Sequence, residues 1–247
     1  MKLDGTVALI TGGAKRVGRA IVLELARAGC DTAIHYRHSD SEARQLAAEV
    51  TEIGRRAVTV RGDLNDPANW PTIIGQTIDG LERLDVLVNN ASVFPADNSD
   101  SLEAFSQSRW ESILRTNLVA PMALCHHARP YLEAHGAGKI INLCDTSADR
   151  PWAQHLGYCA SKAGLAALTK GLARSLAPRV QVNGVAPGIA VFPERYSDEL
   201  RRKLIGKVPL GRAGSPEEVA RLVRFLAEEG DYITGQIIPI DGGRSLV

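Results

Sequence analysis

The sequence predicts an α/β fold, with a doubly wound parallel sheet of about seven strands in a single domain spanning residues 1–247. Short apolar, β-branched runs alternate with longer segments of helical period almost from end to end. Strand–helix–strand units of this kind build a parallel sheet with helices on both faces. The strand segments also lack polar alternation, as expected where both faces of a sheet are buried. A chain of 247 residues can enclose one such core.

The individual elements follow from β-branched enrichment for strands and from apolar spacing for helices. A glycine-rich turn follows the first strand, TVALIT, and leads into the first helix. Ser39 can cap the second helix, and Pro121 is expected to kink or divide the longest one. The predicted strands are residues 6–11, 31–36, 57–61, 85–88, 139–144, 180–185 and 236–240. The predicted helices are residues 17–28, 39–53, 67–79, 102–132, 155–176 and 216–229.

One segment, residues 186–210, departs from this alternation. It runs from a Pro-Gly turn through Phe192-Pro193-Glu194 into a short charged helix. In a parallel sheet, an insertion after a late strand lies at the carboxyl ends of the strands, where ligands bind. We therefore predict a ligand-covering loop and helix here, with an ordinary surface loop as the alternative.

Composition excludes several classes of function. Lys and Arg total 29 against 28 Asp and Glu, a formal net charge of +1, which disfavours a nucleic-acid or anionic-membrane partner. No run approaches the roughly 18 apolar residues of a membrane span, and the first apolar run is too short for a signal peptide. The cysteines form no C-x-x-C pair and suit a reducing compartment, so we expect a soluble cytoplasmic protein. They are Cys30, Cys125, Cys144 and Cys159.

Metal and hydrolase chemistry are not expected. His126 and His127 are adjacent and diverge on a helix, and no H-x-x-x-H pair with a nearby acid occurs. No G-x-S-x-G nucleophile motif occurs either.

The turn after the first strand has the sequence T-G-G-A-K-R-V-G at residues 11–18. Glycines let backbone amides approach a pyrophosphate, which the following helix N-terminus attracts. Arg16 occupies the middle position of the three-glycine fingerprint, and a tight turn without a ligand is the alternative. The position at the first strand–helix junction favours dinucleotide binding. The candidate residues are Gly12, Arg16, Val17 and Gly18.

The end of the second strand distinguishes NAD from NADP. The sequence His35-Tyr36-Arg37-His38-Ser39 contains no acid there. Arg37 can pair with a 2′-phosphate and Ser39 can donate to it, which predicts NADPH; a solvated Arg37 is the alternative. Asp63, after the third strand, is a candidate for the adenine amino group or for a helix cap. His35, Tyr36 and Leu64 complete the expected nucleotide pocket.

Tyr158 and Lys162 lie four residues apart and so share a helix face. A free tyrosine has a pKa of about 10, and a lysine ammonium one turn away stabilises the tyrosinate. We therefore expect Lys162 to lower the pKa of Tyr158. Tyr–Lys pairs with this spacing also occur by chance, so their assignment as catalytic residues depends on the accompanying motifs. These are Asn89-Asn90-Ala91 after the fourth strand, Asn117 in the long helix and Pro187-Gly188 after the sixth strand.

With these motifs the sequence resembles the short-chain dehydrogenase/reductase family over essentially its whole length, which implies a Rossmann-like fold. The family pattern T-G-x(3)-G-x-G matches the first turn except at Arg16. The N-N-A-G motif ends in Ser92 here, and Y-x(3)-K matches Tyr158 and Lys162. Thirteen residues before the tyrosine the family usually has a serine that polarises a carbonyl; this chain has Asp145.

These departures, with Phe94, resemble the pteridine reductase branch of that family. The resemblance implies that the pterin lies between the nicotinamide and Phe94; a partly buried loop aromatic is the alternative. Asp145 would share a proton with Tyr158, and Asn117 would fix a water-linked proton path. Lys162 would hold the nicotinamide ribose. Arg16, Ser92, Phe94, Asp145 and Tyr158 would contact substrate. Asn90, Ala91, Ser92, Tyr158, Lys162, Pro187 and Gly188 would contact the cofactor.

The implied activity is NADPH-dependent hydride transfer to a C=N bond of a dihydropterin, such as dihydrobiopterin or dihydrofolate, giving a tetrahydropterin. A reductase of the same family acting on 3-oxoacyl thioesters or ketones is one alternative. A non-catalytic nucleotide-sensing protein is another. The resemblance also implies a homotetramer in which Arg244 faces a neighbouring subunit's pocket.

Overall fold

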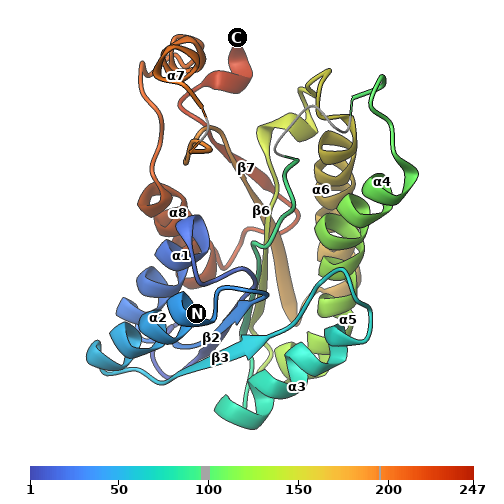
Figure 1. Ribbon diagram of the computed structural model, residues 1–247. Helices are drawn as coiled ribbons and strands as arrows, with labels where there is room; N and C mark the ends of the chain where they lie inside the picture. Colours follow the sequence, from blue (N-terminus) through green and yellow to red (C-terminus); the bar gives the residue numbers. More distant parts are fainter. Residues whose placement is uncertain (96–100, 195) are drawn as a thin grey trace.

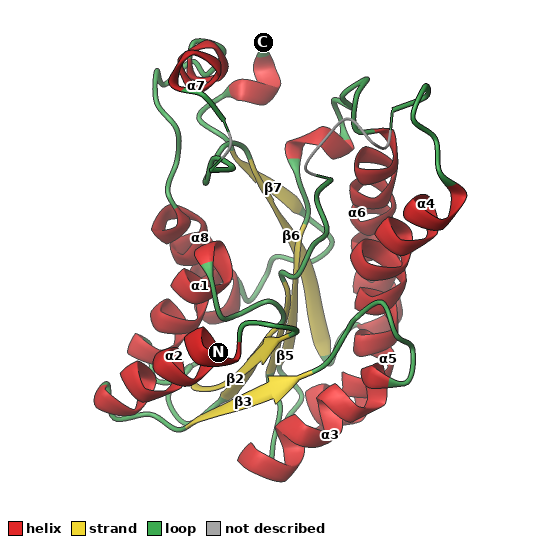
Figure 2. Cartoon of the chain, in the orientation of Figure 1, coloured by secondary structure: helices red, strands yellow, loops and turns green. Residues whose placement is uncertain are grey.

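Seven parallel strands form one sheet in the order β3-β2-β1-β4-β5-β6-β7, and Figure 2 shows the sheet with helices on both sides. The computed structural model describes residues 1–95, 101–194 and 196–247. Strand order reverses between β1 and β4, which creates a crevice at the carboxyl ends of these strands where ligands bind in such folds. The predicted fold class is confirmed. The strands are β1 (Val7–Ile10), β2 (Asp31–Tyr36), β3 (Ala57–Arg61), β4 (Val86–Asn89), β5 (Gly138–Leu143), β6 (Val180–Pro187) and β7 (Ile237–Ile240).

Helices cover both faces of the sheet, and Figure 1 shows α1, α2 and α8 on one side and α3 to α6 on the other. Contacts between α1 and α8 and between α3 and α5 hold each layer together. The helices are α1 (Arg16–Arg27), α2 (Asp40–Glu52), α3 (Asn69–Leu81), α4 (Gln107–Leu114), α5 (Ala120–Ala134), α6 (Leu156–Leu176), α7 (Asp198–Ile205) and α8 (Pro216–Glu228). Short helical turns are η1 (Arg115–Val119), η2 (Thr146–Ala148) and η3 (Arg244–Leu246).

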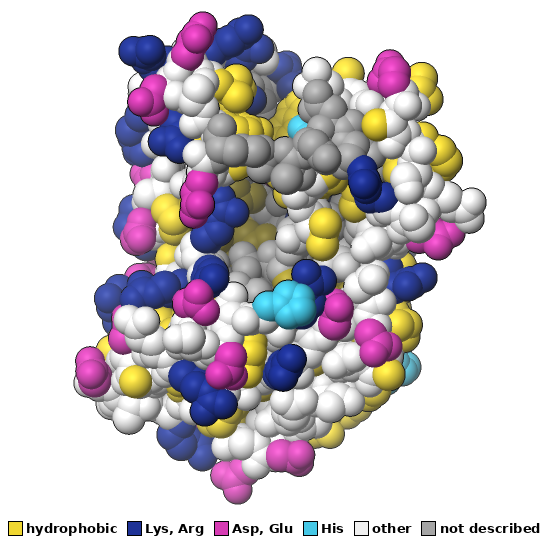
Figure 3. All heavy atoms as spheres, viewed as in Figure 1, with side chains coloured by type: hydrophobic (Ala, Val, Ile, Leu, Met, Phe, Trp, Pro, Cys, Tyr) yellow, Lys and Arg dark blue, Asp and Glu magenta, His cyan; other side chains and the backbone are white. Residues whose placement is uncertain are grey.

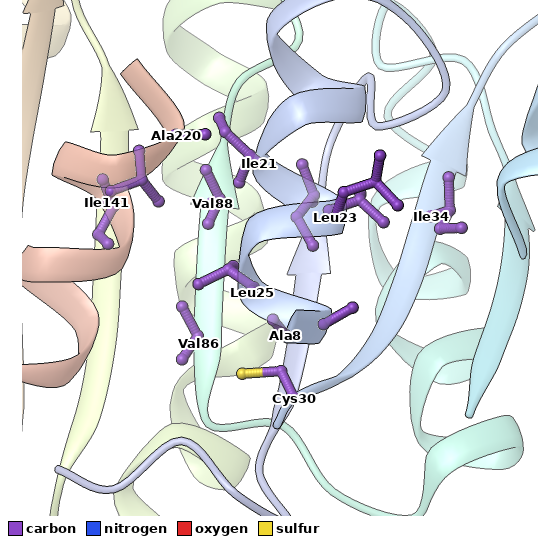
Figure 4. Close-up of a cluster of buried hydrophobic side chains, with 14 of the residues drawn as sticks. Ala8, Ile21, Leu23, Leu25, Cys30, Ile34, Val86, Val88, Ile141 and Ala220 are labelled. Atoms are coloured by element: carbon purple, nitrogen blue, oxygen red, sulfur yellow. The ribbon is translucent and has the colours of Figure 1, made fainter. Parts of the chain in front are cut away.

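The apolar core lies between the sheet and these helix layers. Figure 4 shows Ile21 and Leu25 of α1 against β4, with Ala220 of α8 beside Ile21. Their four-residue spacing places Ile21 and Leu25 on one helix face. Every residue of β1, β2, β4 and β5 is buried, which explains why these strands show no polar alternation.

The helix predicted over residues 102–132 is the main correction to the elements. It begins at Gln107, changes to a π-helical turn at η1, and continues as α5 to Ala134. Leu102 and Phe105 are largely exposed, so no burial favours a helix before Gln107. Pro121 lacks an N–H and cannot bond to the carbonyl of residue 117, so the predicted interruption falls at η1. The other predicted helices and strands occur within two residues of their expected ends.

The segment after β6 carries α7 to the carboxyl end of the sheet (Figure 1). Ser197 caps this helix, because its side chain accepts a hydrogen bond from the Leu200 backbone N–H. α7 buries none of its residues, so it lies over the surface of the domain. Residue 195 of the predicted loop lies outside the described residues.

All four cysteines are buried as free thiols. Among the described residues, no helix is long and apolar enough to cross a membrane. In the same part of the chain, no group of three or more His, Cys, Asp or Glu side chains is placed to hold a metal ion.

Candidate active site

A cleft of about 1020 Å³ opens at the carboxyl ends of the strands. Figure 3 shows it as a hollow between the two helix layers. This volume is at the upper end for a small-molecule site. Residues from four separate strand ends and from α6 meet in it. Those predicted from sequence are Gly12, Arg16, Val17, Gly18, Asn90, Ala91, Ser92, Phe94, Asp145, Tyr158, Lys162, Pro187 and Gly188.

The turn after β1 is held tightly against the end of β4. The Asn90 amide donates to the backbone oxygens of Thr11 at 2.8 Å and Gly12 at 3.2 Å. A Cβ on Gly18 would lie 2.1 Å from the Gly12 oxygen, so only glycine fits at that position. The first turn of α1 contains no acidic residue. Its exposed N–H groups and positive dipole end therefore suit a phosphate group.

Arg16 lies where the short-chain reductase pattern has its middle glycine, and its φ is +54°. This left-handed conformation costs a non-glycine residue about 1–2 kcal/mol. The Arg16 guanidinium donates to the Phe192 backbone oxygen at 3.3 Å, so it links the turn to the segment after β6. A cation at a helix N-terminus opposes the helix dipole. A bound anion would relieve this, so the turn fits a pyrophosphate.

His35, predicted as a cofactor contact, is buried behind the turn and away from the cleft. The Gly12 N–H donates to Nδ1 at 3.1 Å, so the ring proton lies on Nε2, 3.1 Å from the Gly62 oxygen. Burial lowers the pKa of His35 to about 4, and the ring is neutral at physiological pH. His35 therefore supports the phosphate turn from below, and its place in the nucleotide pocket is corrected.

This buried histidine predicts a pH dependence of stability. The unfolded chain binds a proton near pH 6.5, whereas folded His35 does so only at about pH 4. The contribution of neutral His35 to the free energy of unfolding is therefore fully present above pH 6.5. It is lost as the pH falls toward 4. We expect the free energy of unfolding in urea to fall by about 2 kcal/mol between pH 6.5 and 5. His35→Gln should flatten this slope while His126→Gln retains it; equal slopes in both variants would contradict the assignment.

The end of β2 presents Arg37 and Ser39 at the surface. Arg37 lies 3.6 Å from the Asp63 carboxylate, both side chains being about half exposed. Ser39 begins α2 without a side-chain capping bond. Asp63 accepts from the Asn65 backbone N–H and does not cap α3, which begins at Asn69.

The remaining predicted nucleotide residues have other partners. The Tyr36 hydroxyl donates to Asp40 at 2.5 Å, and the Arg44 guanidinium binds the same carboxylate. Leu64 is buried, and its backbone oxygen accepts from Trp70. Neither Tyr36 nor Leu64 lines the cleft, while Arg37 is exposed and Ser39 partly exposed, so both are accessible to a ligand.

Asp145 and Tyr158 form the hydrogen-bonded pair at the centre of the cleft. The Tyr158 hydroxyl donates to Asp145 Oδ2 at 2.9 Å. Asp145 Oδ1 accepts from the Ser147 backbone N–H at 2.7 Å, which fixes the carboxylate at the start of η2. Lys162 Nζ donates to the Leu143 oxygen at 2.7 Å and lies 5.7 Å from the centre of the Tyr158 ring.

The predicted lowering of the Tyr158 pKa is wrong in sign. Burial and the neighbouring Asp145 carboxylate raise the pKa of Tyr158 well above 10. The Lys162 ammonium bonds to a backbone oxygen, and burial lowers the pKa of Lys162 itself. Tyr158 therefore keeps its proton at neutral pH and donates it in the hydrogen bond to Asp145.

Asn117 lies in the π-helical turn η1, with its side chain fully buried. Its amide donates to the Val93 oxygen at 3.0 Å and to Ser161 Oγ at 3.1 Å, while its oxygen accepts from the Val93 N–H at 2.8 Å. Both amide hydrogens are thus engaged. Asn117 positions the segment that carries Ser92 and Phe94 against α6.

Aromatic side chains are concentrated in the cleft. Phe, Trp and Tyr form only 5% of the chain, yet five of them line this site. The Phe94 ring lies 4.9 Å from that of Tyr158 and 4.7 Å from that of His155. The Trp152 and Tyr158 rings are nearly parallel at 6.2 Å. A flat ring system fits such walls.

Sequence reasoning missed most of these aromatic residues. The spacing of Trp152, His155 and Tyr158 along a short stretch was an available signal in a chain poor in aromatics. Phe192 and Tyr196, in the segment after β6, offered a weaker one. Lining residues that were not assigned individually include Trp152, Gln154, His155, Phe192, Tyr196, Leu200, Leu204 and Lys207. The last five lie in the segment 186–210, which was predicted to cover the ligand. Arg244, expected at a partner's pocket, lines the cleft of its own chain.

Known proteins resemble this chain over nearly its whole length. The family described as Enoyl-(Acyl carrier protein) reductase matches residues 12–245. The 3-oxoacyl-[acyl-carrier-protein] reductase FabG of Staphylococcus aureus is 33% identical over 240 residues, 96% of each chain.

Solved structures agree in fold. A blue fluorescent protein from a metagenomic library, in complex with NADPH, superposes with a TM-score of 0.91 at 34% identity over 99% of each chain. FolM alternative dihydrofolate reductase 1 from Brucella canis, complexed with NADP, gives 0.90 at 34% identity over 100% of this chain and 97% of that one. A dehydrogenase/reductase from Sinorhizobium meliloti 1021 gives 0.91 at 33% identity, covering 98% and 97%.

Proposed function

Because the chain belongs to the short-chain dehydrogenase/reductase family, and is an NAD(P)-dependent short-chain reductase, we propose that it is an NADPH-dependent pteridine reductase. The substrate would be a dihydropterin, reduced at a C=N bond to a tetrahydropterin. The observation that carries this proposal is the hydrogen bond between Asp145 and Tyr158.

A carboxylate bonded to a phenol suits protonation of a ring nitrogen. The Tyr158 hydroxyl already directs its proton at the Asp145 carboxylate. Serine, usual in the family at the place of Asp145, supplies a neutral hydroxyl that polarises a ketone oxygen. A carboxylate there would instead repel the negative charge that develops on a ketone oxygen during reduction. The Asp145–Tyr158 pair therefore favours a nitrogen acceptor over a carbonyl.

The walls of the cleft support a flat heteroaromatic substrate. Phe94 offers a phenyl face, and offset stacking adds to the area that the ring buries. Asn117 holds the segment bearing Phe94 at a fixed distance from α6. Arg16 crosses the cleft to Phe192 and brings its guanidinium within reach of both the phosphate turn and the substrate end.

The chemistry divides between the cofactor and this chain. NADPH, when bound, would supply the hydride for the carbon of the C=N bond and would thereby be oxidised to NADP⁺. The Asp145–Tyr158 pair holds the proton that is donated to the nitrogen. A proton from solvent then replaces it. Lys162 Nζ lies 5.7 Å from the centre of the Tyr158 ring, and the Leu143 carbonyl fixes its position; its ammonium would bind the nicotinamide ribose. One NADPH and one proton are consumed for each dihydropterin reduced.

The comparisons support two candidate substrates. FolM, named an alternative dihydrofolate reductase, favours a pterin-like ring. FabG, named a 3-oxoacyl-[acyl-carrier-protein] reductase, favours a 3-oxoacyl thioester, which is the second candidate. Their identities to this chain are 34% and 33%, so similarity alone does not separate them. Asp145 and the aromatic walls favour the pterin.

The phosphorylated dinucleotide is expected to bind much more tightly than the unphosphorylated one. Arg37 is exposed at the end of β2 and no acid lies within that strand's last residues. The next acid along the chain, Asp40, is bonded to Tyr36 and Arg44, and Arg37 itself lies 3.6 Å from the Asp63 carboxylate. We expect a dissociation constant for NADPH at least about tenfold below that for NADH, because a charge-assisted pair contributes about 1.5–3 kcal/mol. Fluorescence titration measures both; equal affinities would exclude the assignment.

Reduction of dihydrobiopterin by the purified protein tests the proposed function. NADPH oxidation at 340 nm and chromatography of the product should give one tetrahydrobiopterin per NADPH consumed. Tyr158→Phe keeps the ring but removes the hydroxyl, so it should bind NADPH and lose turnover. Absence of dihydrobiopterin-dependent NADPH oxidation by the wild-type protein would refute the proposal.

A further inference from the structure

A second cavity of about 680 Å³ adjoins the active-site cleft. Thr146, Trp152, Lys207 and Arg244 line both cavities. No residue of the phosphate turn and none from the segment after β4 lines the second one. The second cavity therefore continues from the substrate end of the cleft, away from the cofactor phosphates.

Trp152 marks the junction between the two cavities. On one side its ring is nearly parallel to that of Tyr158, at 6.2 Å, and so belongs to the walls around the reacting pair. On the other side it lines the second cavity beside Arg150 and Pro151. A side chain attached to a ring bound near Tyr158 would pass Trp152 to leave the cleft.

The second cavity is basic. Arg150, Lys207 and Arg244 line it, and no Asp or Glu side chain does; the one anionic group in its lining is the terminal carboxylate of Val247. The Arg150 guanidinium already donates to the Val247 backbone oxygen. Lys207 and Arg244 make no ion pair with any carboxylate in residues 1–95, 101–194 and 196–247.

Two unpaired cations at the wall of a cavity are suited to an anion. An anionic group held between them would interact favourably with both cations. The cofactor would not supply that group, since the turn after β1 would hold its phosphates. The substrate remains as the source of the negative charge.

We propose, on the basis of the pteridine reductase function above, that Lys207 and Arg244 form a subsite for an anionic group at the end of the substrate's side chain. The preferred substrates are dihydropterins whose side chain carries a carboxylate or a phosphate. Dihydropterins with a neutral side chain fill only the first cavity. Carboxylate and phosphate share the recognised chemistry, and the choice between them is made by experiment.

Binding of oxidised pterins tests the subsite independently of turnover. Folate and biopterin share the pterin ring, but only folate carries carboxylates. Quenching of tryptophan fluorescence in the presence of NADP⁺ should show folate binding at least about tenfold more tightly than biopterin. Raising the ionic strength should reduce that advantage. Equal affinity of folate and biopterin at low salt would refute the proposal that the subsite binds a carboxylate.

Matched charge-removing variants locate the effect. Lys207→Gln and Arg244→Gln should each lower folate affinity by about five- to tenfold, with a smaller effect on biopterin. Arg202→Gln is the control, because Leu200 and Leu204 of α7 line the cleft and Arg202 lies on the opposite face of that helix. An equal loss in Arg202→Gln would show only a general charge effect and would overturn the subsite.

Turnover measurements distinguish a carboxylate ligand from a phosphate ligand. They also distinguish failure of the proposed subsite from failure of the proposed reductase function. In Lys207→Gln, the ratio of kcat/KM for dihydrofolate to that for dihydrobiopterin should fall, mainly through KM. Dihydroneopterin monophosphate is the phosphate arm: a fall with this substrate alone supports a phosphate ligand. If neither substrate responds, the subsite is refuted even where dihydrobiopterin is reduced. If folate binds through Lys207 but nothing is reduced, the subsite stands and the proposed reductase function fails.

Discussion

Replacing Asp145 with serine is expected to lower the turnover of dihydrobiopterin at least about 100-fold, within the 10²–10⁴-fold range of a positioned acid–base group. The Asp145 carboxylate accepts the Tyr158 hydroxyl at 2.9 Å and is fixed by the Ser147 N–H. Serine keeps a polar group but cannot share the proton or maintain the raised pKa of Tyr158. Steady-state kinetics with NADPH and dihydrobiopterin measure the loss.

The same variant should bind NADPH with nearly unchanged affinity, because the phosphate turn makes no bond to Asp145. Asp149→Ser is the matched control: it removes the same charge four residues away, and Asp149 does not line the cleft. We expect that variant to retain turnover. If Asp145→Ser retains both turnover and NADPH affinity, Asp145 takes no part in the chemistry.

Gly18→Ala is expected to raise the dissociation constant for NADPH at least about 100-fold, equivalent to about 2.7 kcal/mol. The new Cβ would lie 2.1 Å from the Gly12 oxygen and 2.7 Å from the Asn90 amide nitrogen. The first of these is backbone, and the second holds the turn to β4. Neither can move away without opening the phosphate turn. Fluorescence titration with NADPH measures the effect.

Gly75→Ala is the control for this substitution. Gly75 lies within α3, and a Cβ there would meet nothing within 4 Å. Alanine favours a helix interior over glycine by about 1 kcal/mol, so this variant should bind NADPH normally and melt slightly higher. Normal NADPH affinity in a folded Gly18→Ala protein would contradict the tight turn described above.

The fold was predictable because its determinants are local. Apolar runs and helical periods fix the type of each element, and strand–helix alternation then fixes a parallel sheet. The helix predicted over residues 102–132 begins too early, which shows the limit of predicting elements from local sequence. Leu102 and Phe105 fit the helical period, yet both remain largely exposed, and only tertiary burial could reveal that.

The site was predictable where motifs place residues at strand ends. Asp145, Tyr158 and Lys162 come together as their spacing indicates. The sign of the Tyr158 pKa shift was not predictable, because it depends on burial and on which atom Lys162 binds. His35 was misplaced for a similar reason: its strand position is compatible with either face, and packing places it behind the turn.

The second cavity depends on residues far apart in the sequence. Trp152 follows η2, Lys207 follows α7, and Arg244 begins the last turn, η3; no local pattern relates them.

The homotetramer, the cytoplasmic location and the exclusion of nucleic-acid and membrane partners stay predictions.

The ratio of kcat/KM for dihydrobiopterin to that for acetoacetyl-CoA, both with NADPH, tests the central claim most directly. Both substrates require the same cofactor, Tyr158 and Lys162, so the ratio isolates the contribution of Asp145 and the aromatic walls. We predict that dihydrobiopterin is preferred by at least about 100-fold, a discrimination typical of sites built to bind a specific polar group. Efficient reduction of acetoacetyl-CoA with no reduction of dihydrobiopterin would contradict the account and establish a 3-oxoacyl thioester reductase.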